Sequence, residues 1–143
     1  MGLIAVVLTR LVRRGLFRQV EVVGLERIPR DRPVVLVANH FNGFVDVAVM
    51  VASVGRLPRF VAKSTIGANP FVRALLRMFR VVLVRRPEDM VDGAVDNTAM
   101  FTETTAALSK GDMVALFPEG TTHDRTSLAR IRTGAARIAF SAH

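Results

Sequence analysis

Two ionisable residues lie close enough in this sequence to perform acid–base chemistry: His40, and Asp46 six positions later. A carboxylate bonded to one imidazole nitrogen fixes the tautomer and leaves the other nitrogen free to act as a base. Such a base can remove a hydroxyl proton while the oxygen attacks a carbonyl carbon, which accelerates a reaction roughly 10²–10⁴-fold. Gly43 lies between the two and allows a sharp turn. On residue types alone, a structural histidine that caps the next helix remains the alternative.

The pair leads to a geometric prediction. No other acid lies between residues 32 and 87, so Asp46 has no local substitute. We therefore expect Asp46 to contact the His40 ring at roughly 2.6–3.2 Å.

A second polar run follows the apolar residues 113–117. It consists of Pro118, Glu119, Gly120, Thr121, Thr122, His123 and Asp124. The amides and hydroxyls of such a turn can hold phosphate or hydroxyl oxygens, and an ordinary polar loop is the alternative. Arg85 follows another apolar run, at 81–84. Its guanidinium suits phosphate oxygens, with a solvated surface charge as the alternative.

The elements that must position these residues alternate between strands and helices. We predict strands at 19–23, 34–38, 59–62, 81–84 and 113–117, and helices at 3–18, 45–54, 70–78, 91–110 and from 135 onward. The continuous apolar run 34–38 is typical of a strand buried on both faces. This alternation predicts an α/β domain, with a mostly parallel sheet flanked by helices. Parallel sheets carry their sites at the carboxyl ends of strands, where His40 and Glu119 both fall.

Composition narrows the function classes. The chain has 143 residues, which fits one domain, and a formal net charge of +8, which indicates an anionic partner. Nucleic acid is less favoured, because there is no Tyr or Trp for base stacking, but it stays as an alternative in which His40 has no role. The absence of cysteine excludes disulfides, thiolate zinc sites and a cysteine nucleophile. No pair among the three histidines has the spacing of a zinc-binding helix.

The predicted domain organisation separates an N-terminal helix, residues 1–18, from residues 19–143. The helix carries an apolar side made of Ile4, Leu8, Leu11, Val12 and Leu16, and a side with arginines at 10, 13, 14 and 18. This amphipathic, basic pattern predicts a helix at an anionic membrane interface; a helix packed on its own domain is the alternative. No apolar run reaches the roughly 20 residues of a membrane span, and charges that follow the apolar stretch argue against a secretory signal.

Taken together, three motifs resemble those of the glycerol-phosphate acyltransferase superfamily, which includes lysophosphatidic acid and glycerol-3-phosphate acyltransferases. They are Asn39-His40 with Asp46, Arg85 after its strand, and Phe117-Pro118-Glu119-Gly120-Thr121. The resemblance implies His40 as general base, Asp46 as its orienting partner and Arg85 on the acceptor phosphate. It assigns the acceptor-binding loop to Glu119, Gly120, Thr121 and Thr122.

The same resemblance implies a reaction and a location. An acyl group would move from acyl-CoA or acyl carrier protein onto a hydroxyl of glycerol 3-phosphate or 1-acylglycerol 3-phosphate, at the cytoplasmic face of a membrane and without a metal or bound cofactor. This chain departs from the commoner pattern in three places: five residues rather than four between His40 and Asp46, Thr122 where arginine is common, and Phe79 where glycine is common. The first two departures occur together in some glycerol-3-phosphate acyltransferases.

The last residues of the sequence indicate whether the predicted domain contains all of the family's motifs. Residue 143 falls inside a predicted helix, and the family's fourth motif, an apolar strand with proline, is not reached. We therefore expect a domain that is incomplete at its C-terminus. A catalytically inactive, membrane-binding fragment of the same fold is the alternative to an active enzyme.

Overall fold

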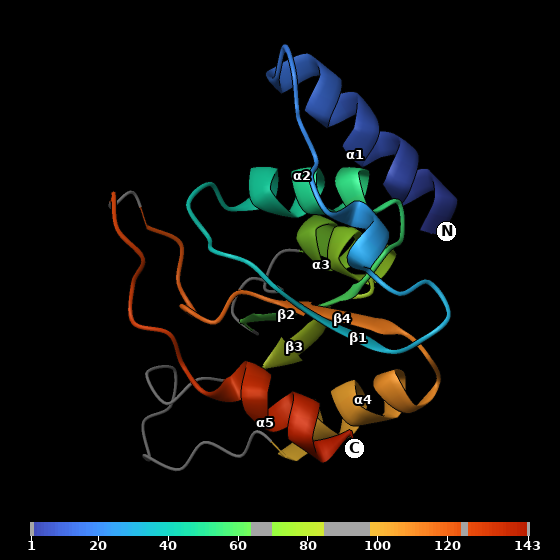
Figure 1. Cartoon of the computed structure of the whole chain (residues 1–143), viewed down its shortest axis with the longest axis vertical. Helices are drawn as coiled ribbons and strands as arrows, with labels where there is room; N and C mark the ends of the chain where they lie inside the picture. The colour runs from blue at the N-terminus through green and yellow to red at the C-terminus, as the bar shows by residue number, and fades with distance from the viewer. Residues whose placement is uncertain (1, 64–69, 85–97, 124–125, 143) are drawn as a thin grey trace.

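A computed structural model describes residues 2–63, 70–84, 98–123 and 126–142 of the chain. The elements, in order, are α1 (Gly2–Leu16), a short 3₁₀ helix η1 (Leu25–Arg27), β1 (Val34–Val37), α2 (Phe44–Val54), β2 (Arg59–Lys63), α3 (Pro70–Met78), β3 (Val82–Val84), α4 (Thr98–Ser109), β4 (Met113–Leu116) and α5 (Gly134–Ser141). Figure 1 shows the course of the chain through them.

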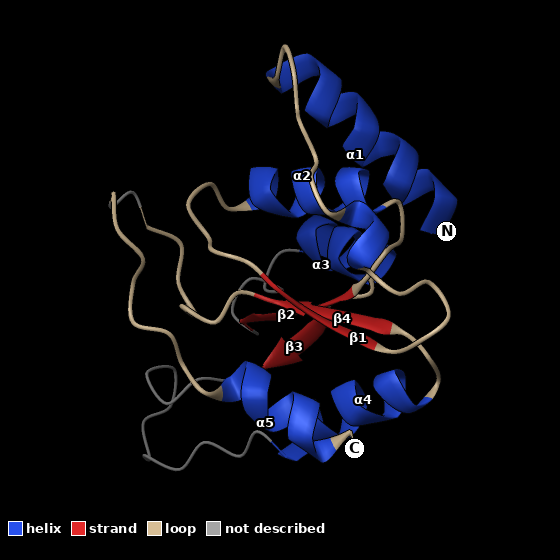
Figure 2. Cartoon of the chain, viewed as in Figure 1, coloured by secondary structure: helices blue, strands red, loops and turns tan. Residues whose placement is uncertain are grey.

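The strands form one parallel sheet in the order β1-β4-β2-β3, which confirms the predicted α/β class. β4 lies inside the sheet, with Val34 of β1 opposite Met113 and Arg59 of β2 opposite Val114. Helices α1, α2 and α3 lie on one side of the sheet, and α4 and α5 on the other (Figure 2). Because all four strands run in the same direction, their carboxyl ends meet at one edge.

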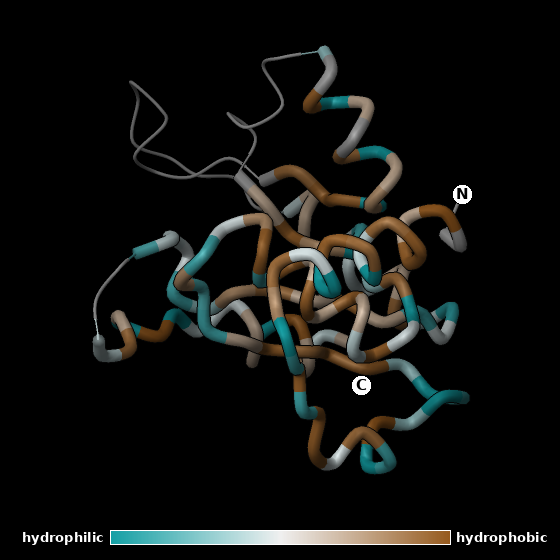
Figure 3. The backbone as a smooth tube through the Cα atoms, turned by 90° about the horizontal axis from the view of Figure 1, so that it is seen from above, coloured by the Kyte–Doolittle hydropathy of each residue, from teal (hydrophilic) through white to brown (hydrophobic). Residues whose placement is uncertain are grey.

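Two apolar clusters stabilise the three layers, and β4 contributes to both. Every residue of β4 is buried, and successive side chains point to opposite faces of the sheet. Val114 and Leu116 pack with Ile138 and the buried residues of α4. Ala115 packs on the opposite face with residues of α1, α2 and β2. Figure 3 shows hydrophobic segments of the chain through the middle of the molecule, and many of the hydrophilic segments toward its margin.

Most predicted elements are confirmed within about two residues, but two expectations about strands are wrong. Residues 19–23 form no strand, and Val22 and Val23 are 43% and 86% exposed. β1 is only partly buried, because it lies at the edge of the described sheet and pairs with β4 alone. Val37 is accordingly 47% exposed. Residues 91–97 of the predicted helix 91–110 lie outside the described residues.

α1 is helical as predicted and packs against α2, but through a different side from the predicted apolar one. Ala5, Val6 and Thr9 are buried, since small side chains allow the two helices to approach closely. The large residues Ile4, Leu11 and Leu16, by contrast, are 64%, 59% and 59% exposed. The helix therefore rests on its own domain and still presents an apolar surface outward. Among the described helices, none is long and apolar enough to cross a bilayer.

Candidate active site

His40 and Asp46 meet at the carboxyl edge of the sheet, as the sequence predicts. Directly after β1, the Ala38 N–H donates one further backbone hydrogen bond to the Leu116 carbonyl of β4, at 3.4 Å. It then turns at Gly43, whose φ of 52° suits a residue without a side chain, and enters α2. Asp46 lies in the first turn of α2, and its Oδ2 is 3.0 Å from His40 Nδ1. The predicted contact between the two side chains is therefore confirmed.

The same carboxylate oxygen also orders the loop between the two residues. Asp46 Oδ2 accepts a hydrogen bond from the Asn42 N–H at 2.8 Å. Because Asp46 is an acceptor, a neutral His40 ring carries its proton on Nδ1 and leaves Nε2 as the basic nitrogen. The Phe117 ring stacks on the imidazole at 3.9 Å between centroids and an angle of 13°. The ring is thus held by a hydrogen bond at one nitrogen and by packing on one face.

Glu119 ties this pair to the loop that follows β4. Its side chain is only 1% exposed, and its carboxylate accepts hydrogen bonds from the His40 N–H (3.2 Å), the Ala129 N–H (3.1 Å) and Nε2 of His123. The His123 hydrogen bond, opposed by burial and aided by the two backbone N–H groups, holds the pKa of the Glu119 carboxyl below its ordinary value. The side chain therefore joins three segments internally, and its assignment to the acceptor-binding loop stays a prediction.

The next residues of the loop do reach open space. Gly120 adopts a φ of 70° and closes a turn through its N–H to the Phe117 carbonyl, 3.0 Å. Thr121 and Thr122 follow on the surface, and the His123 N–H bonds back to the His40 carbonyl at 3.3 Å. His40 is therefore connected to the loop through both its N–H and its carbonyl.

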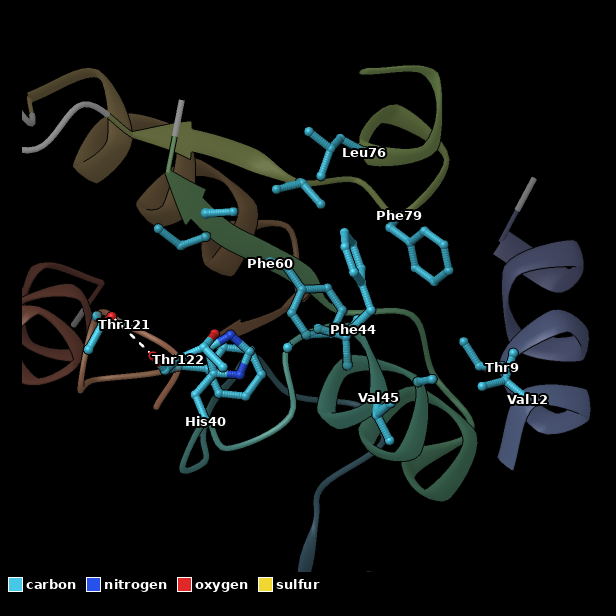
Figure 4. Close-up of a pocket in the computed structure, with 18 of the residues that line it drawn as sticks. Thr9, Val12, His40, Phe44, Val45, Phe60, Leu76, Phe79, Thr121 and Thr122 are labelled. Carbon is cyan, nitrogen blue, oxygen red and sulfur yellow. Dashed lines mark hydrogen bonds between the residues drawn. The ribbon is translucent and has the colours of Figure 1, made fainter. Parts of the chain in front are cut away.

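A pocket of about 600 Å³ opens beside His40 and is lined mainly by apolar side chains. Figure 4 shows His40, Thr121 and Thr122 at one end, Thr9 and Val12 of α1 at the other, and aromatic rings between them. The aromatic residues that line the pocket are Phe44, Phe60, Phe79 and Phe117. Phe79 thus stands in the pocket wall, at the position where the resembled family often has glycine. A site of this size and lining suits a ligand with a long apolar portion.

Two side chains at this site have no predicted role, and one predicted residue lies outside the described part of the chain. The sequence predicts no role for His123, although its position four residues after Glu119 is the available signal. Phe117 belongs to the third motif but has no predicted role of its own, whereas the structure stacks it on His40. Arg85, predicted to bind phosphate, lies outside the described residues. Within the described part of the chain, no group of three His, Asp or Glu side chains could hold a metal ion.

Comparison with known proteins places this arrangement in context. The chain is 36% identical over 115 residues to a lyso-ornithine lipid O-acyltransferase of Rhizobium meliloti (strain 1021), covering 80% of this chain and 37% of that protein. It is 32% identical over 119 residues to lysophosphatidylcholine acyltransferase 2 of Rattus norvegicus, covering 82% and 21% respectively. The chain therefore spans well under half the length of these relatives.

The fold is shared with a solved structure. The crystal structure of the 1-acyl-sn-glycerophosphate acyltransferase PlsC from Thermotoga maritima superposes with a TM-score of 0.74 and 24% identity, covering 96% of this chain and 52% of that one. Residues 19–143, most of the chain, match the family described as Acyltransferase. The chain belongs to the acyltransferase family.

Proposed function

We propose that this chain is a glycerolipid O-acyltransferase that moves a fatty acyl group from a thioester, acyl-CoA or acyl carrier protein, onto a hydroxyl of an acceptor lipid or glycerol phosphate. One observation carries the proposal. A His–Asp pair with contact at 3.0 Å stands at the end of an apolar pocket of about 600 Å³. The base and the space for an acyl chain are thus adjacent, and the chain's relatives are named as acyltransferases.

The chemistry follows from the orientation of the imidazole. His40 Nε2 removes the acceptor hydroxyl proton as the oxygen attacks the thioester carbonyl carbon, and Asp46 stabilises the resulting imidazolium. The tetrahedral intermediate then collapses, the carbon–sulfur bond breaks, and the thiolate leaves with the proton returned from His40. No covalent acyl-enzyme is needed. The acyl chain lies among Phe44, Phe60 and Phe79 in the apolar pocket.

The proposed location is the membrane–water interface. α1 exposes large apolar residues, and Leu8 and Val12 of the same helix also line the pocket. An interfacial helix at the pocket wall would allow an acyl chain to pass between bilayer and site without crossing water. We propose peripheral attachment to an anionic membrane, on the cytoplasmic side where acyl thioesters are found.

The test is acyl transfer by the purified chain on anionic vesicles. Donors are acyl-CoA and acyl carrier protein, acceptors are glycerol 3-phosphate and 1-acylglycerol 3-phosphate, and products are identified by mass spectrometry. His40→Ala should reduce turnover roughly 10²–10⁴-fold. Asp31→Asn, which changes an exposed acid, serves as the matched control and should behave as wild type. Absence of product with every pair, or unchanged turnover in His40→Ala, would refute the proposed activity in this chain and favour a membrane-binding fragment.

A further inference from the structure

His123 turns inward from the loop that follows β4 and is linked to His40. Its side chain is only 9% exposed, whereas Thr121 and Thr122 beside it are exposed. Nε2 of the His123 ring donates to one oxygen of the Glu119 carboxylate. The other oxygen of that carboxylate accepts the His40 N–H at 3.2 Å. One buried carboxylate therefore connects the His123 ring to the backbone of His40.

A second connection runs directly between the two histidines. The His123 N–H donates to the His40 carbonyl at 3.3 Å. The His123 ring also meets the ring of Phe41 edge-on, with 5.0 Å between centroids and an angle of 86°. The N–H of His40, its carbonyl and the side chain that follows it along the chain thus all contact either Glu119 or His123.

We propose that His123 is a positioning residue for His40: through Glu119 it fixes the backbone from which the imidazole projects. The proposal rests on the proposed acyl transfer and adds a residue to it. Asp46 holds only Nδ1 of the ring, so a shift of the His40 backbone would move Nε2 even if the contact with Asp46 survived. Misplacement of a reacting group by about 1 Å can lower turnover by about 10²-fold.

Glu119 needs a partner such as His123 because its carboxylate is buried. A buried charge is costly unless it is paired and hydrogen-bonded. Among the groups that hold Glu119 ionised, the His123 hydrogen bond lowers the pKa of the carboxyl more than the N–H groups of Ala129 and His40 do. Without this donor, the carboxylate would either take up a proton or turn toward water. In both cases its bond to the His40 N–H would weaken.

Two substitutions separate the hydrogen bond of His123 from its packing. His123→Gln keeps an N–H donor near the position of Nε2 and loses the ring, whereas His123→Phe keeps a ring against Phe41 and loses the donor. His123→Phe should lower kcat for acyl transfer by roughly 10–100-fold. The acceptor KM should stay within about threefold of wild type, because His123 is not among the residues that line the pocket. His123→Gln should recover most of the lost turnover. Wild-type kcat in His123→Phe, or equal losses in the two variants, would overturn the proposal.

A double variant tests the route through Glu119. If His123 acts on His40 through that carboxylate, His123→Phe combined with Glu119→Gln should lose no more turnover than Glu119→Gln alone, since the two residues share one path. Losses that multiply would show that His123 acts independently of Glu119, and would overturn this route.

Hydrogen exchange of the His40 amide, followed by NMR, reports on the backbone without any substrate. Glu119 protects this N–H in wild type. His123→Phe should therefore accelerate its exchange by roughly 10-fold relative to the amides of β4, and His123→Gln should not. Unchanged relative exchange in His123→Phe would contradict the positioning role.

Thr104→Ala is the matched control for a general loss of stability. Thr104 is fully buried in α4, on the face of the sheet opposite α2 (Figure 2), and its hydroxyl donates to the Met100 carbonyl at 2.8 Å. This variant should lower Tm but leave kcat and the relative exchange of the His40 amide as in wild type. If His123→Phe does not fold, His123→Leu, which also lacks the donor, takes its place.

The two measurements separate failure of this inference from failure of the proposed function. If wild type transfers acyl groups but His123→Phe changes neither kcat nor exchange at His40, the positioning role is refuted and the acyltransferase stands. If no acyl transfer occurs but exchange at His40 depends on His123, the link to the His40 backbone stands and the proposed activity fails.

Discussion

Replacement of Asp46 separates the effect of its negative charge on turnover from the effect of its hydrogen bonds. Asp46 Oδ2 accepts two hydrogen bonds, from His40 Nδ1 at 3.0 Å and from the Asn42 N–H at 2.8 Å. Asp46→Asn can keep an oxygen in that position and therefore both hydrogen bonds, but it removes the negative charge that faces the imidazolium. Asp46→Ala removes the hydrogen bonds as well as the charge. The two variants should therefore differ in a defined order.

The magnitude follows from the distance and the exposure of the pair. Two unit charges about 4 Å apart attract by about 4 kcal/mol at an effective dielectric constant of about 20, and by about 1 kcal/mol in bulk water. The two side chains are 17% and 21% exposed, which places the pair between these limits. Loss of the charge alone in Asp46→Asn should then lower kcat by about 10–100-fold. Asp46→Ala, which also frees the tautomer and the ring orientation, should lose about 10²–10⁴-fold.

Release of coenzyme A thiol, followed with a chromogenic disulfide, measures these rates directly. The protein has no cysteine and adds no background to this assay. KM for the acceptor should stay within about threefold of wild type, because Asp46 acts through His40 and not on the acceptor. Wild-type turnover in Asp46→Ala would refute the assignment of the pair as a catalytic unit. If turnover is lower in Asp46→Asn than in Asp46→Ala, the hydrogen bonds of Asp46 do not contribute to turnover in addition to its charge.

Three further predictions concern the membrane, pH and the core. Leu11→Glu with Leu16→Glu should weaken co-sedimentation with anionic vesicles by roughly 10²-fold, since two exposed leucines can no longer enter the interface. Because the folded-state pKa of Glu119 lies below its ordinary 4.5, its carboxylate stabilises the fold fully above that value, and the contribution is lost as pH falls through the lowered pKa. Glu119→Gln should therefore flatten the decline of Tm at acid pH in thermal melts, and should also reduce turnover, because the His40 backbone loses its carboxylate partner. Ile138→Ala should reduce the free energy of unfolding in urea by about 2–5 kcal/mol, since Ile138 is fully buried.

Control variants or the wild-type protein provide the comparison for each of these predictions. Val23→Glu changes another exposed apolar residue, 86% exposed and outside α1, and should leave vesicle binding intact. Phe140→Ala, at 83% exposure in the same helix as Ile138, should change stability by no more than about 0.5 kcal/mol. Vesicle binding unaffected by the leucine changes would contradict the interfacial role of α1. If Tm declines at acid pH as steeply in Glu119→Gln as in wild type, the Glu119 carboxylate does not stabilise the fold as predicted.

The features that the sequence predicted correctly are those set by local pattern. Strand and helix periods indicated most elements, and alternation of the two indicated a parallel sheet. His40 and Asp46 could be paired because only a short loop and one helical turn separate them. His40 and Glu119 could be expected at one edge because each follows a parallel strand directly.

The features that the sequence did not predict depend on contacts between distant segments. The edge position of β1 follows from strand order, which local hydropathy does not encode. The inward direction of Glu119 depends on the His40 N–H, 79 residues earlier, and on the Ala129 N–H, ten residues later. The side of α1 that packs depends on how closely two helices approach, so small Ala5 is buried while large Leu11 is exposed.

The place of β4 in the sheet also has a consequence during synthesis of the protein. β4 comes last along the chain among the described strands, yet it lies between β1 and β2. Until residues 113–116 leave the ribosome, β1 lacks its partner in the described sheet, and Glu119, which holds the His40 backbone, is still inside the ribosome. At about 5–20 residues per second, α1 precedes Glu119 by roughly 5–20 s. We therefore expect α1 to be able to reach a bilayer while the edge that carries His40 is still unformed, so that the proposed membrane attachment can precede the proposed acyl transfer.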